Sequence, residues 1–284
     1  SALKQEEDSI VFNTGYMANL GMITSLVTKD DIVFIDRLNH ASIIDAVRLS
    51  GAKVCVYKHL DLDDLEVKIK KYKAKNSFII TDTVFSMDGD IAPLKELVYL
   101  AKKYEIFLIV DEAHSFGVFG KNGAGLTEEY CLQGQVDLVM GTFSKAAGLI
   151  GGYVSGKKDI IDLIRNKSRP LIYTTALPPG IVCGIIKSVE LIKNAKDKRK
   201  KLWENIKYFK NSDSQIISII IGDNEKVLQV SKRLREHGLF VPAIRYPTVK
   251  KGTERLRISL TAEHDKEDID KFITPLQGLN LQGG

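Results

Sequence analysis

Two patterns of hydrophobic residues alternate along the chain. Short runs rich in β-branched and aromatic residues are separated by segments whose apolar residues recur every three or four positions. The runs predict strands at Ser9–Asn13, Ile32–Ile35, Lys53–Tyr57, Ser77–Thr83, Ile106–Asp111, Leu138–Thr142 and Gly152–Ser155. The segments predict helices at Tyr16–Leu26, Ala41–Leu49, Leu62–Tyr72 and Pro93–Lys103. Strands that alternate with helices are typical of βαβ units, so the predicted fold class is α/β with a mainly parallel sheet.

The predicted sheet is buried on both faces. Phe107–Val110 reads Phe-Leu-Ile-Val, without the polar alternation that a strand with one wet face shows. Pro93 follows the turn-rich stretch 86–90 and is predicted at the first position of its helix, where the missing N–H costs nothing. We therefore expect helices to cover this sheet on both sides.

The pattern changes after Leu177–Pro178–Pro179. There the sequence predicts one long helix, then a strand at Gln215–Ile221, an amphipathic helix at Glu225–His237 and a strand at Arg255–Leu260. The predicted domains are a large domain over residues 1–178, a connecting helix over 179–210 and a small C-terminal α/β domain over 211–284.

Composition and charge narrow the function classes. The 284 residues are 44% apolar, which is enough for a sizeable core, and 41 basic against 36 acidic residues leave a net charge of only +5. No basic tail suggests nucleic acid, and no apolar run approaches the roughly 18 residues that a membrane span needs. The basic run Lys193–Lys201 is interpreted as the solvated end of a helix; contact with an anionic group such as a coenzyme A phosphate is the alternative.

The cysteines predict neither a metal site nor disulfides. Cys55, Cys131 and Cys183 lie far apart and show no C-x-x-C spacing. We therefore expect no metal and a cytoplasmic location.

Polar residues that follow apolar strands are the candidates for chemistry, because ligands of open α/β sheets bind beyond the carboxyl ends of the strands. Asp111 ends one such strand and His114 follows it. Lys145 follows another, and a desolvated lysine there would have the depressed pKa that a Schiff-base amine requires. Taken alone, a lysine at this position is more often an ordinary loop lysine, whereas an acid that ends a buried strand needs a cationic partner.

Two further turns join a strand to a helix. Gly15 and Tyr16 follow the first predicted strand, where backbone N–H groups at a helix start could bind an anion; a tight turn explains this glycine nearly as well. His40 precedes the helix that begins near Ala41, and an ordinary loop histidine is its simpler interpretation.

Seven motifs, in this order, resemble the α-oxoamine synthase family of fold-type I pyridoxal-phosphate enzymes. They are FNTGYMANLG (12–21), DRLNHASIIDA (36–46), TDTVFSMDGDIAPL (81–94), VDEAHSFGVFGKNGAG (110–125), GTFSKAAG (141–148), RPLIYTTALPP (169–179) and IRYPTVKKGTERLRISLTAEH (244–264). The resemblance runs from about Ile10 to about Asp270. It implies a seven-stranded sheet with helices on both faces and a smaller C-terminal domain.

The resemblance also implies roles around one cofactor, pyridoxal 5′-phosphate. Lys145 matches the lysine that carries it as a Schiff base, Asp111 the acid facing its ring nitrogen, and His114 the histidine that bonds its phenolic oxygen. His40 matches an imidazole stacked on the ring. The remaining matches to cofactor-binding positions are Ser86, Gly15, Tyr16, Thr142 and, from a neighbouring subunit, Thr174 or Thr175. For the substrate, Arg257 matches the arginine that pairs with the amino-acid carboxylate, and Thr248 and His40 match other substrate contacts.

The implied activity is a decarboxylative condensation of an amino acid with an acyl-CoA thioester. The motifs lean toward the branch that joins L-alanine to pimeloyl-CoA or a pimeloyl carrier thioester for biotin synthesis, in a homodimer with a shared active site. Glycine C-acetyltransferase, serine palmitoyltransferase and 5-aminolevulinate synthase share the same core residues and remain alternatives. Full-length family members carry an N-terminal segment ahead of the point where this chain begins, so a catalytically silent fragment or partner subunit is a further alternative.

Overall fold

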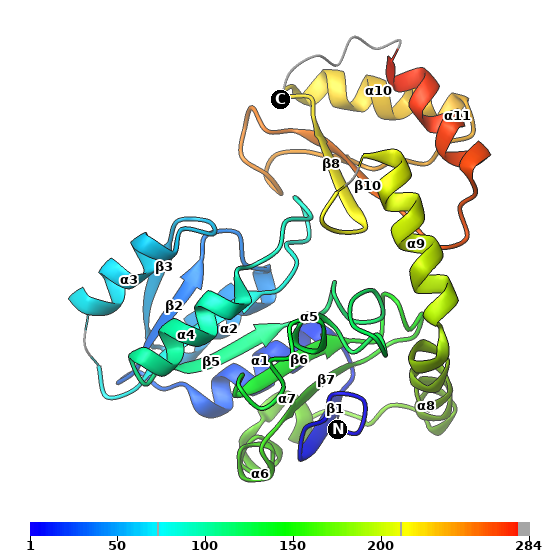
Figure 1. Ribbon diagram of the computed structural model, residues 1–284. Helices are drawn as coiled ribbons and strands as arrows, with labels where there is room; N and C mark the ends of the chain where they lie inside the picture. Colours follow the sequence, from blue (N-terminus) through cyan, green and yellow to red (C-terminus); the bar gives the residue numbers. More distant parts are fainter. Residues whose placement is uncertain (73, 211, 278–284) are drawn as a thin grey trace. The chain divides into compact units, whose positions relative to one another are not determined.

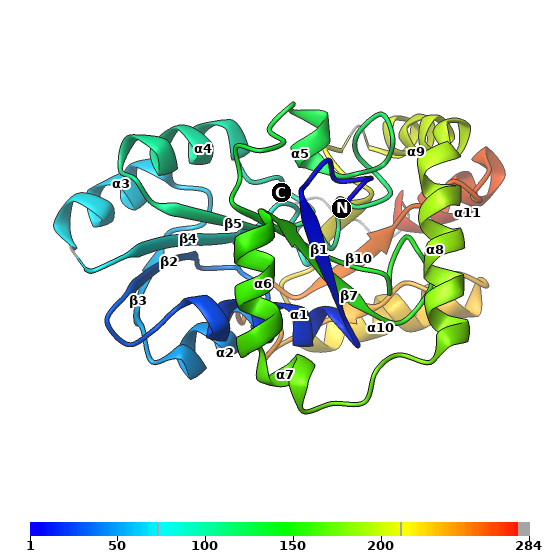
Figure 2. The same cartoon turned by 90° about the horizontal axis from the view of Figure 1, so that it is seen from below.

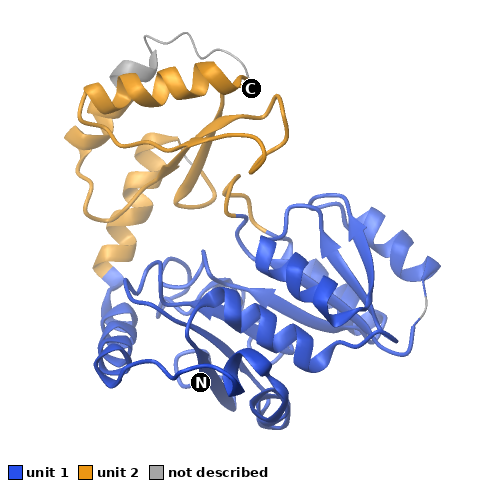
Figure 3. Ribbon diagram, turned by 180° about the vertical axis from the view of Figure 1, so that it is seen from behind, with its two compact units in different colours: residues 1–85, 92–196 blue, residues 86–91, 197–284 orange. Residues whose placement is uncertain are grey.

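The structure is a computed structural model that describes residues 1–72, 74–210 and 212–277 (Figure 1). The chain divides into two compact units, which Figure 3 colours separately. Unit 1 comprises Ser1–Phe85 and Ala92–Lys196, and unit 2 comprises Ser86–Ile91 and the chain from Asp197 onward. The predicted limit of the large domain at residue 178 differs from this division, because residues 179–196 also belong to unit 1 and residues 86–91 belong to unit 2.

Unit 1 is built on a seven-stranded sheet. Its strands are β1 (Asp8–Phe12), β2 (Ile32–Asp36), β3 (Lys53–Tyr57), β4 (Ser77–Asp82), β5 (Phe107–Asp111), β6 (Leu138–Thr142) and β7 (Gly152–Gly156). Their order is β1-β7-β6-β5-β4-β2-β3. Strand β7 is antiparallel to both of its neighbours, and the other pairs are parallel. The predicted strands agree with these within two residues at each end, and the mainly parallel seven-stranded sheet is confirmed.

Helices cover both faces of this sheet, as the apolar central strands predict. Figure 2 shows α3 (Leu62–Lys71) and α4 (Leu94–Lys103) on one side and α1 (Gly15–Leu26) and α2 (Ala41–Ser50) on the other. Buried residues of α1 and α2, such as Met22, Ile23 and Val47, form one core with strand residues such as Ile109 and Met140. The shared core therefore holds α1 and α2 against the sheet.

Side chains at the helix starts explain several of these limits. The Thr14 hydroxyl accepts a hydrogen bond from the Met17 N–H at α1, and Asp61 caps α3 in the same way through Asp64 N–H. Gly51 follows the last residue of α2 and has a φ of 74°, a conformation that glycine adopts at little energetic cost. Pro93 is the residue before α4 rather than its first helical residue, a difference of one position from the prediction.

The remaining helices of unit 1 are α5 (Leu126–Glu129), α6 (Lys158–Lys167), α7 (Arg169–Ile172) and α8 (Pro179–Asn194). The single helix predicted over residues 179–210 is wrong. The structure has two helices there, α8 and α9 (Lys196–Phe209), separated at Ala195, whose φ of −82° and ψ of 39° are not helical. The apolar residues of α8 pack in unit 1, for example Ile185 and Ile192, whereas α9 belongs to unit 2.

Unit 2 is a small α/β unit. Besides α9 it contains β8 (Ile216–Ile220), α10 (Asn224–Glu236), β9 (Ala243–Ile244), β10 (Arg255–Ser259) and α11 (Lys266–Gln277), with the antiparallel strand order β8-β10-β9. The loop 86–91 joins this unit through Ser214, whose hydroxyl donates to the Gly89 carbonyl over 2.6 Å. The predicted small domain includes residue 211 and residues 278–284, which lie outside the described residues. Within the described part of the chain, no helix combines the length and apolar character that a membrane crossing needs.

Candidate active site

A pocket of about 210 Å³ lies in unit 1 where several strands end. Asp82, Asp111 and Thr142 are the last residues of β4, β5 and β6, and all three line it. The other residues of its wall are Thr14, Gly15, Tyr16, Asn19, His40, Ser42, Ala113, His114, Met140, Ser144 and Lys145. The pocket therefore lies at the carboxyl edge of the sheet, where a ligand of an open α/β sheet is expected.

The structure brings seven of the predicted site residues together here. They are Gly15, Tyr16, His40, Asp111, His114, Thr142 and Lys145. Ser86, Thr248 and Arg257 belong to unit 2 and are described there. Thr174 and Thr175 do not line the pocket within the described chain; instead, the Asn13 side-chain amide donates to the Thr175 carbonyl over 2.6 Å.

Asp111 is buried at the centre of the pocket wall, with 5% of its surface exposed. One of its carboxylate oxygens accepts a hydrogen bond from the Asn19 amide and the other from the Ala113 N–H, both over 2.8 Å. These donors are neutral, so they orient the carboxylate without cancelling its charge. A buried carboxylate held in this way favours a cationic ligand group beside it.

A second buried carboxylate, Asp82, stands beside Asp111 in register on the neighbouring strand. Burial raises the pKa of Asp82 well above its ordinary value, and the charge of Asp111 raises it further, whereas the His40 N–H and Lys145 lower it. Two carboxylates this close and this dry do not both ionise readily. Burial and the neighbouring carboxylate therefore favour the protonated form of Asp82.

Lys145 lies in the turn after β6. The Thr142 hydroxyl donates to the Gly151 carbonyl over 2.9 Å, and the Phe143 N–H donates to the same carbonyl at the same distance. This fixes the base of the turn. Lys145 itself is exposed, so the condition for a depressed pKa that the sequence analysis named, a desolvated lysine, is not met in this chain.

The start of α1 forms the opposite wall. A Cβ atom on Gly15 would lie 3.1 Å from the Thr142 Cβ and 3.2 Å from the Met140 terminal carbon, so a side chain there would crowd the wall. The first N–H groups of a helix have no partner within the helix. Glycine thus brings backbone donors, with the positive end of the helix dipole, close to the Thr142 hydroxyl.

His40 caps α2 at the mouth of the pocket. Its N–H donates to the Asp82 carboxyl over 2.8 Å, and its ring Nδ1 lies 2.7 Å from the Ser42 hydroxyl. Although His40 is exposed, loss of hydration around the ring lowers its pKa; Lys145 acts in the same direction, and Asp111 and Asp45 oppose it. The neutral imidazole is therefore favoured at neutral pH.

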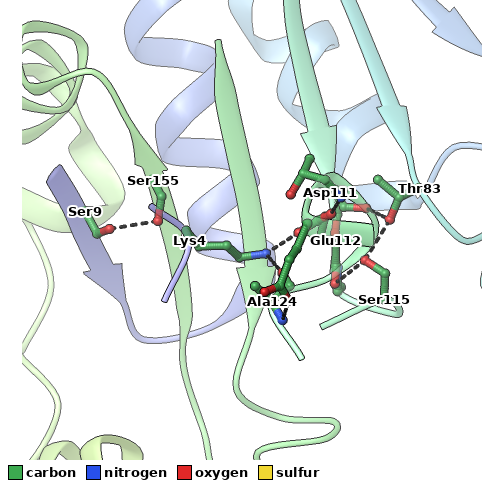
Figure 4. A network of polar contacts seen from close by, with 11 residues as sticks. Lys4, Ser9, Thr83, Asp111, Glu112, Ser115, Ala124 and Ser155 are labelled. Carbon is green, nitrogen blue, oxygen red and sulfur yellow. Dashed lines mark hydrogen bonds and ion pairs between the residues drawn. The ribbon is translucent and has the colours of Figure 1, made fainter. Parts of the chain in front are cut away.

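The turn after Asp111 is held by a network of buried polar contacts (Figure 4). Glu112 is fully buried, and its carboxylate pairs with Lys4 and accepts from the Thr127 N–H over 2.7 Å. The Lys4 ammonium also donates to the Ala124 carbonyl. Three segments far apart in the sequence therefore meet at the residue next to Asp111.

Arg257 is the cationic candidate of unit 2. Its Nε donates to the Ser86 carbonyl over 2.6 Å and its Nη1 to the Ser259 hydroxyl over 2.7 Å. Burial lowers the pKa of Arg257 from its ordinary value. Both of these acceptors are neutral oxygens, so neither cancels the charge of the guanidinium. Thr248 is exposed in the turn between β9 and β10.

Five polar residues of the pocket were not among the predicted site residues: Thr14, Asn19, Ser42, Asp82 and Ser144. Asp82 could have been found, because it ends a predicted apolar strand just as Asp111 does. Asn19 and Ser42 lie inside helices, and only the packing of α1 beside α2 brings them to the pocket.

Comparison with known proteins agrees with this architecture. The family model "Aminotransferase class I and II" matches residues 1–276. The 8-amino-7-oxononanoate synthase of Thermoanaerobacter pseudethanolicus is 43% identical over 98% of this chain and 74% of its own length. That of Treponema denticola is 46% identical over 95% of this chain and 72% of its own length.

Solved structures give the same result. A high-resolution structure of SPT with PLP superimposes with a TM-score of 0.93 at 36% identity, covering 98% of this chain and 73% of that one. The 8-amino-7-oxononanoate synthase from Francisella tularensis superimposes with a TM-score of 0.86 at 33% identity, covering 98% of this chain and 84% of that one. The chain therefore belongs to the aminotransferase class I and II family and, within it, to the α-oxoamine synthases.

Proposed function

We propose that this protein is an 8-amino-7-oxononanoate synthase, a pyridoxal-phosphate enzyme that condenses L-alanine with a pimeloyl thioester and releases CO₂. The observation that supports it most directly is the pocket that Lys145, Asp111, His114 and His40 line together. The curated relatives of that name, at 43% and 46% identity, support the choice within the family.

Serine palmitoyltransferase is the second candidate. Solved structures of that enzyme superimpose as well as any reported above, at 35–36% identity. The synthase from Francisella tularensis is no more similar, at 33%. The structures therefore do not separate the two candidates, and the preference rests on the higher identity of the curated relatives.

The residues of the pocket fit pyridoxal 5′-phosphate. Because a side chain would not fit at Gly15, the backbone N–H groups at the start of α1 are accessible, which suits a phosphate. The buried Asp111, oriented by neutral donors, suits a protonated ring nitrogen, and Lys145 supplies the amine for covalent attachment. When bound, the cofactor supplies an electron sink for the pair of electrons left on the substrate α-carbon.

The protein groups then have distinct tasks. Asp111 holds the proton on the ring nitrogen, because an adjacent anion raises the pKa of that nitrogen. His114 would donate to the phenolic oxygen, and the Gly15 and Tyr16 N–H groups would bind the phosphate. The Thr142 hydroxyl would join them by exchanging its present hydrogen bond to the Gly151 carbonyl for one to the phosphate. Lys145 would hold the cofactor covalently and, when its amine is free, would take the substrate α-proton as general base.

Residues of unit 2 are proposed to recognise the amino acid. The Arg257 guanidinium suits a carboxylate because its planar fork makes two parallel hydrogen bonds to it. Ser86 is held next to Arg257 by the hydrogen bond from Nε to its carbonyl, and its hydroxyl is proposed to contact the cofactor. Thr248 is a further proposed substrate contact.

The choice of amino acid tests the proposal. L-Alanine, glycine or L-serine is added to the cofactor-loaded protein, and the visible absorbance of the cofactor is followed before and after addition of pimeloyl-CoA. We expect L-alanine to change the spectrum and pimeloyl-CoA then to release coenzyme A and CO₂. A response to L-serine alone would establish the second candidate in its place.

We further propose that two copies form a dimer in which Thr174 or Thr175 of one copy completes the phosphate site of the other. Large apolar side chains are exposed on α7, on α8 and in the segment between them: Ile172, Tyr173, Val182, Ile186 and Leu191. Val182 and Ile186 lie one turn apart on α8, and exposed apolar residues on one face of a helix are typical of a protein contact. The three free cysteines suit the reducing cytoplasm that we propose as its location.

Sedimentation equilibrium measures the mass of the assembly. We expect about twice the 31.7 kDa of one chain, and a shift toward the monomer for Ile186→Asp, whose charge would be buried unpaired in the contact. Leu49→Asp, an equally exposed apolar residue on α2, is the control. A wild-type protein that stays at the mass of one chain at all concentrations contradicts the dimer.

A further inference from the structure

The ring of His40 is held by a single residue of α2. The Ser42 backbone N–H lies 3.2 Å from His40 Nδ1, and the Ser42 hydroxyl oxygen lies 2.7 Å from the same nitrogen. Ser42 is 1% exposed, so neither group can turn to water instead. Both groups can donate a hydrogen bond to Nδ1, so they determine whether this nitrogen carries a proton.

Asn19 of α1 fixes the direction of the Ser42 hydroxyl. Its side-chain nitrogen donates to the Ser42 oxygen over 2.9 Å and to the Asp111 carboxylate over 2.8 Å. The opposite orientation of the amide would set its oxygen against a carboxylate oxygen. Asn19 is also 1% exposed, and its Oδ1 has no hydrogen-bond partner among the described residues. The orientation of this amide is therefore set by Asp111.

Counting donors and acceptors then gives the tautomer of His40. The Ser42 oxygen already accepts from Asn19, so its own proton is free to go to His40 Nδ1. If Nδ1 carried a proton, it would face the Ser42 N–H, which can only donate, and the Ser42 hydroxyl proton would lose its acceptor. A bare Nδ1 satisfies all of these groups, and the ring proton then sits on Nε2.

We propose that Asn19 and Ser42 are positioning residues that hold neutral His40 with its proton on Nε2, and that this makes His40 a hydrogen-bond donor to a substrate oxygen and excludes it as a base. This rests on the proposed function. The oxygen is that of a carboxylate or a thioester carbonyl, since both accept hydrogen bonds. It follows that the α-proton goes to Lys145 and not to His40.

Charged groups around His40 do not reverse this assignment. Asp82 accepts a hydrogen bond from the His40 backbone N–H, so this contact does not involve the ring. Asp111 and Asp45 favour a charged ring, whereas burial and Lys145 favour a neutral one. Asp45 in turn accepts the Tyr16 hydroxyl proton over 2.5 Å. The neutral ring is favoured by the balance of these groups, and Ser42 then decides which nitrogen carries the proton.

The test is the ¹⁵N NMR spectrum of the histidine rings in the complete 284-residue chain, recorded with and without pyridoxal 5′-phosphate. The chain has only five histidines, and the loss of one set of signals in His40→Gln identifies His40. We expect the Nδ1 shift of an unprotonated nitrogen and the Nε2 shift of a protonated one at neutral pH. A protonated Nδ1 in the wild-type protein overturns the proposal without any variant.

Ser42→Ala removes the hydroxyl donor. We expect signals of the other tautomer to appear, and the titration midpoint of His40 to rise by roughly one pH unit, because the neutral ring loses a hydrogen bond to Nδ1. Asn19→Ala should move the signals in the same direction. It should add little in the Ser42→Ala background, since Asn19 acts on the ring through Ser42.

Ser50→Ala is the matched control, because its hydroxyl donates to the Val47 carbonyl of the same helix. A merely structural role of Ser42 would lower the unfolding midpoint and leave the ring signals as in the wild type, and this also overturns the proposal. The measurement needs no turnover. If no amino acid reacts but the tautomer is as expected, the proposed function fails and the assignment of His40 stands.

Discussion

Replacing Lys145 with alanine is expected to lower turnover by roughly 10³-fold or more and to remove the visible absorbance of lysine-bound cofactor. The substitution removes both the covalent attachment and the general base, each of which contributes strongly to such a reaction. Lys145 is exposed in the turn after β6, so the free energy of unfolding should change by less than about 0.5 kcal/mol.

Lys157 offers a matched control, because it is exposed and directly follows strand β7 as Lys145 follows β6. Lys157→Ala should keep both turnover and absorbance. The absorbance is read by titrating cofactor into the purified variants, and stability by urea denaturation. If Lys145→Ala retained the absorbance of covalently bound cofactor, another amine would have to carry it.

The second large effect is expected on stability. Replacing Lys4 with methionine leaves Glu112 buried without its ionic partner, which should cost about 3 to 5 kcal/mol in the free energy of unfolding. Methionine fills much of the same volume, so the loss reports the charge and not a cavity. Replacing Glu112 with glutamine as well should recover most of the loss, since no charge then remains unpaired.

The exposed pair between Lys58 and Asp61, 3.6 Å apart, is the control. Lys58→Met should change stability by less than about 1 kcal/mol, because exposed ion pairs contribute little. Equal urea midpoints for Lys4→Met and Lys58→Met would show that the buried pair does not stabilise the fold.

The pH dependence of this stabilisation follows from the direction in which the pKa of Lys4 is shifted. Burial disfavours the charge of Lys4, but Glu112 and Tyr153 outweigh it and raise the pKa of Lys4 above its ordinary 10.5. Its stabilising effect is therefore complete below that value and is lost only as the pH rises through the raised pKa. The difference between wild type and Lys4→Met should stay constant through the neutral range and shrink at alkaline pH.

The central sheet was predictable because each strand carries its own signal. Lys53–Tyr57 and Leu138–Thr142 were predicted to the residue, since apolar β-branched runs bounded by polar turns are strong local patterns. The four-residue helices α5 and α7 are too short to show any period. Helices α6 and α11 were not predicted, although Ile161 and Ile164 in α6 recur at the helical spacing and could have revealed it.

The candidate site also has features that the sequence predicts and features that it does not. Asp111 ends its strand, and His114 and Lys145 each lie three residues beyond a strand end, so strand ends and motifs were enough to nominate them. The environment of each residue depends on segments distant in the sequence: Asp82 acts on Asp111 only through the register of β4 with β5, and no local pattern gives that register. The exposure of Lys145 could not be predicted for the same reason, because burial depends on everything packed around a turn.

The pairing of β1 has a consequence for the order in which unit 1 can form. β1 is an edge strand, and its partner is β7, with Asp8 opposite Gly156 and Phe12 opposite Gly152. On the ribosome, β1 emerges long before its partner has been translated, and the Lys4 contact with Glu112 must wait as well. A growing chain therefore holds an unpaired, partly apolar strand until it has been translated as far as Gly156, and such strands are where aggregation begins and where chaperones bind.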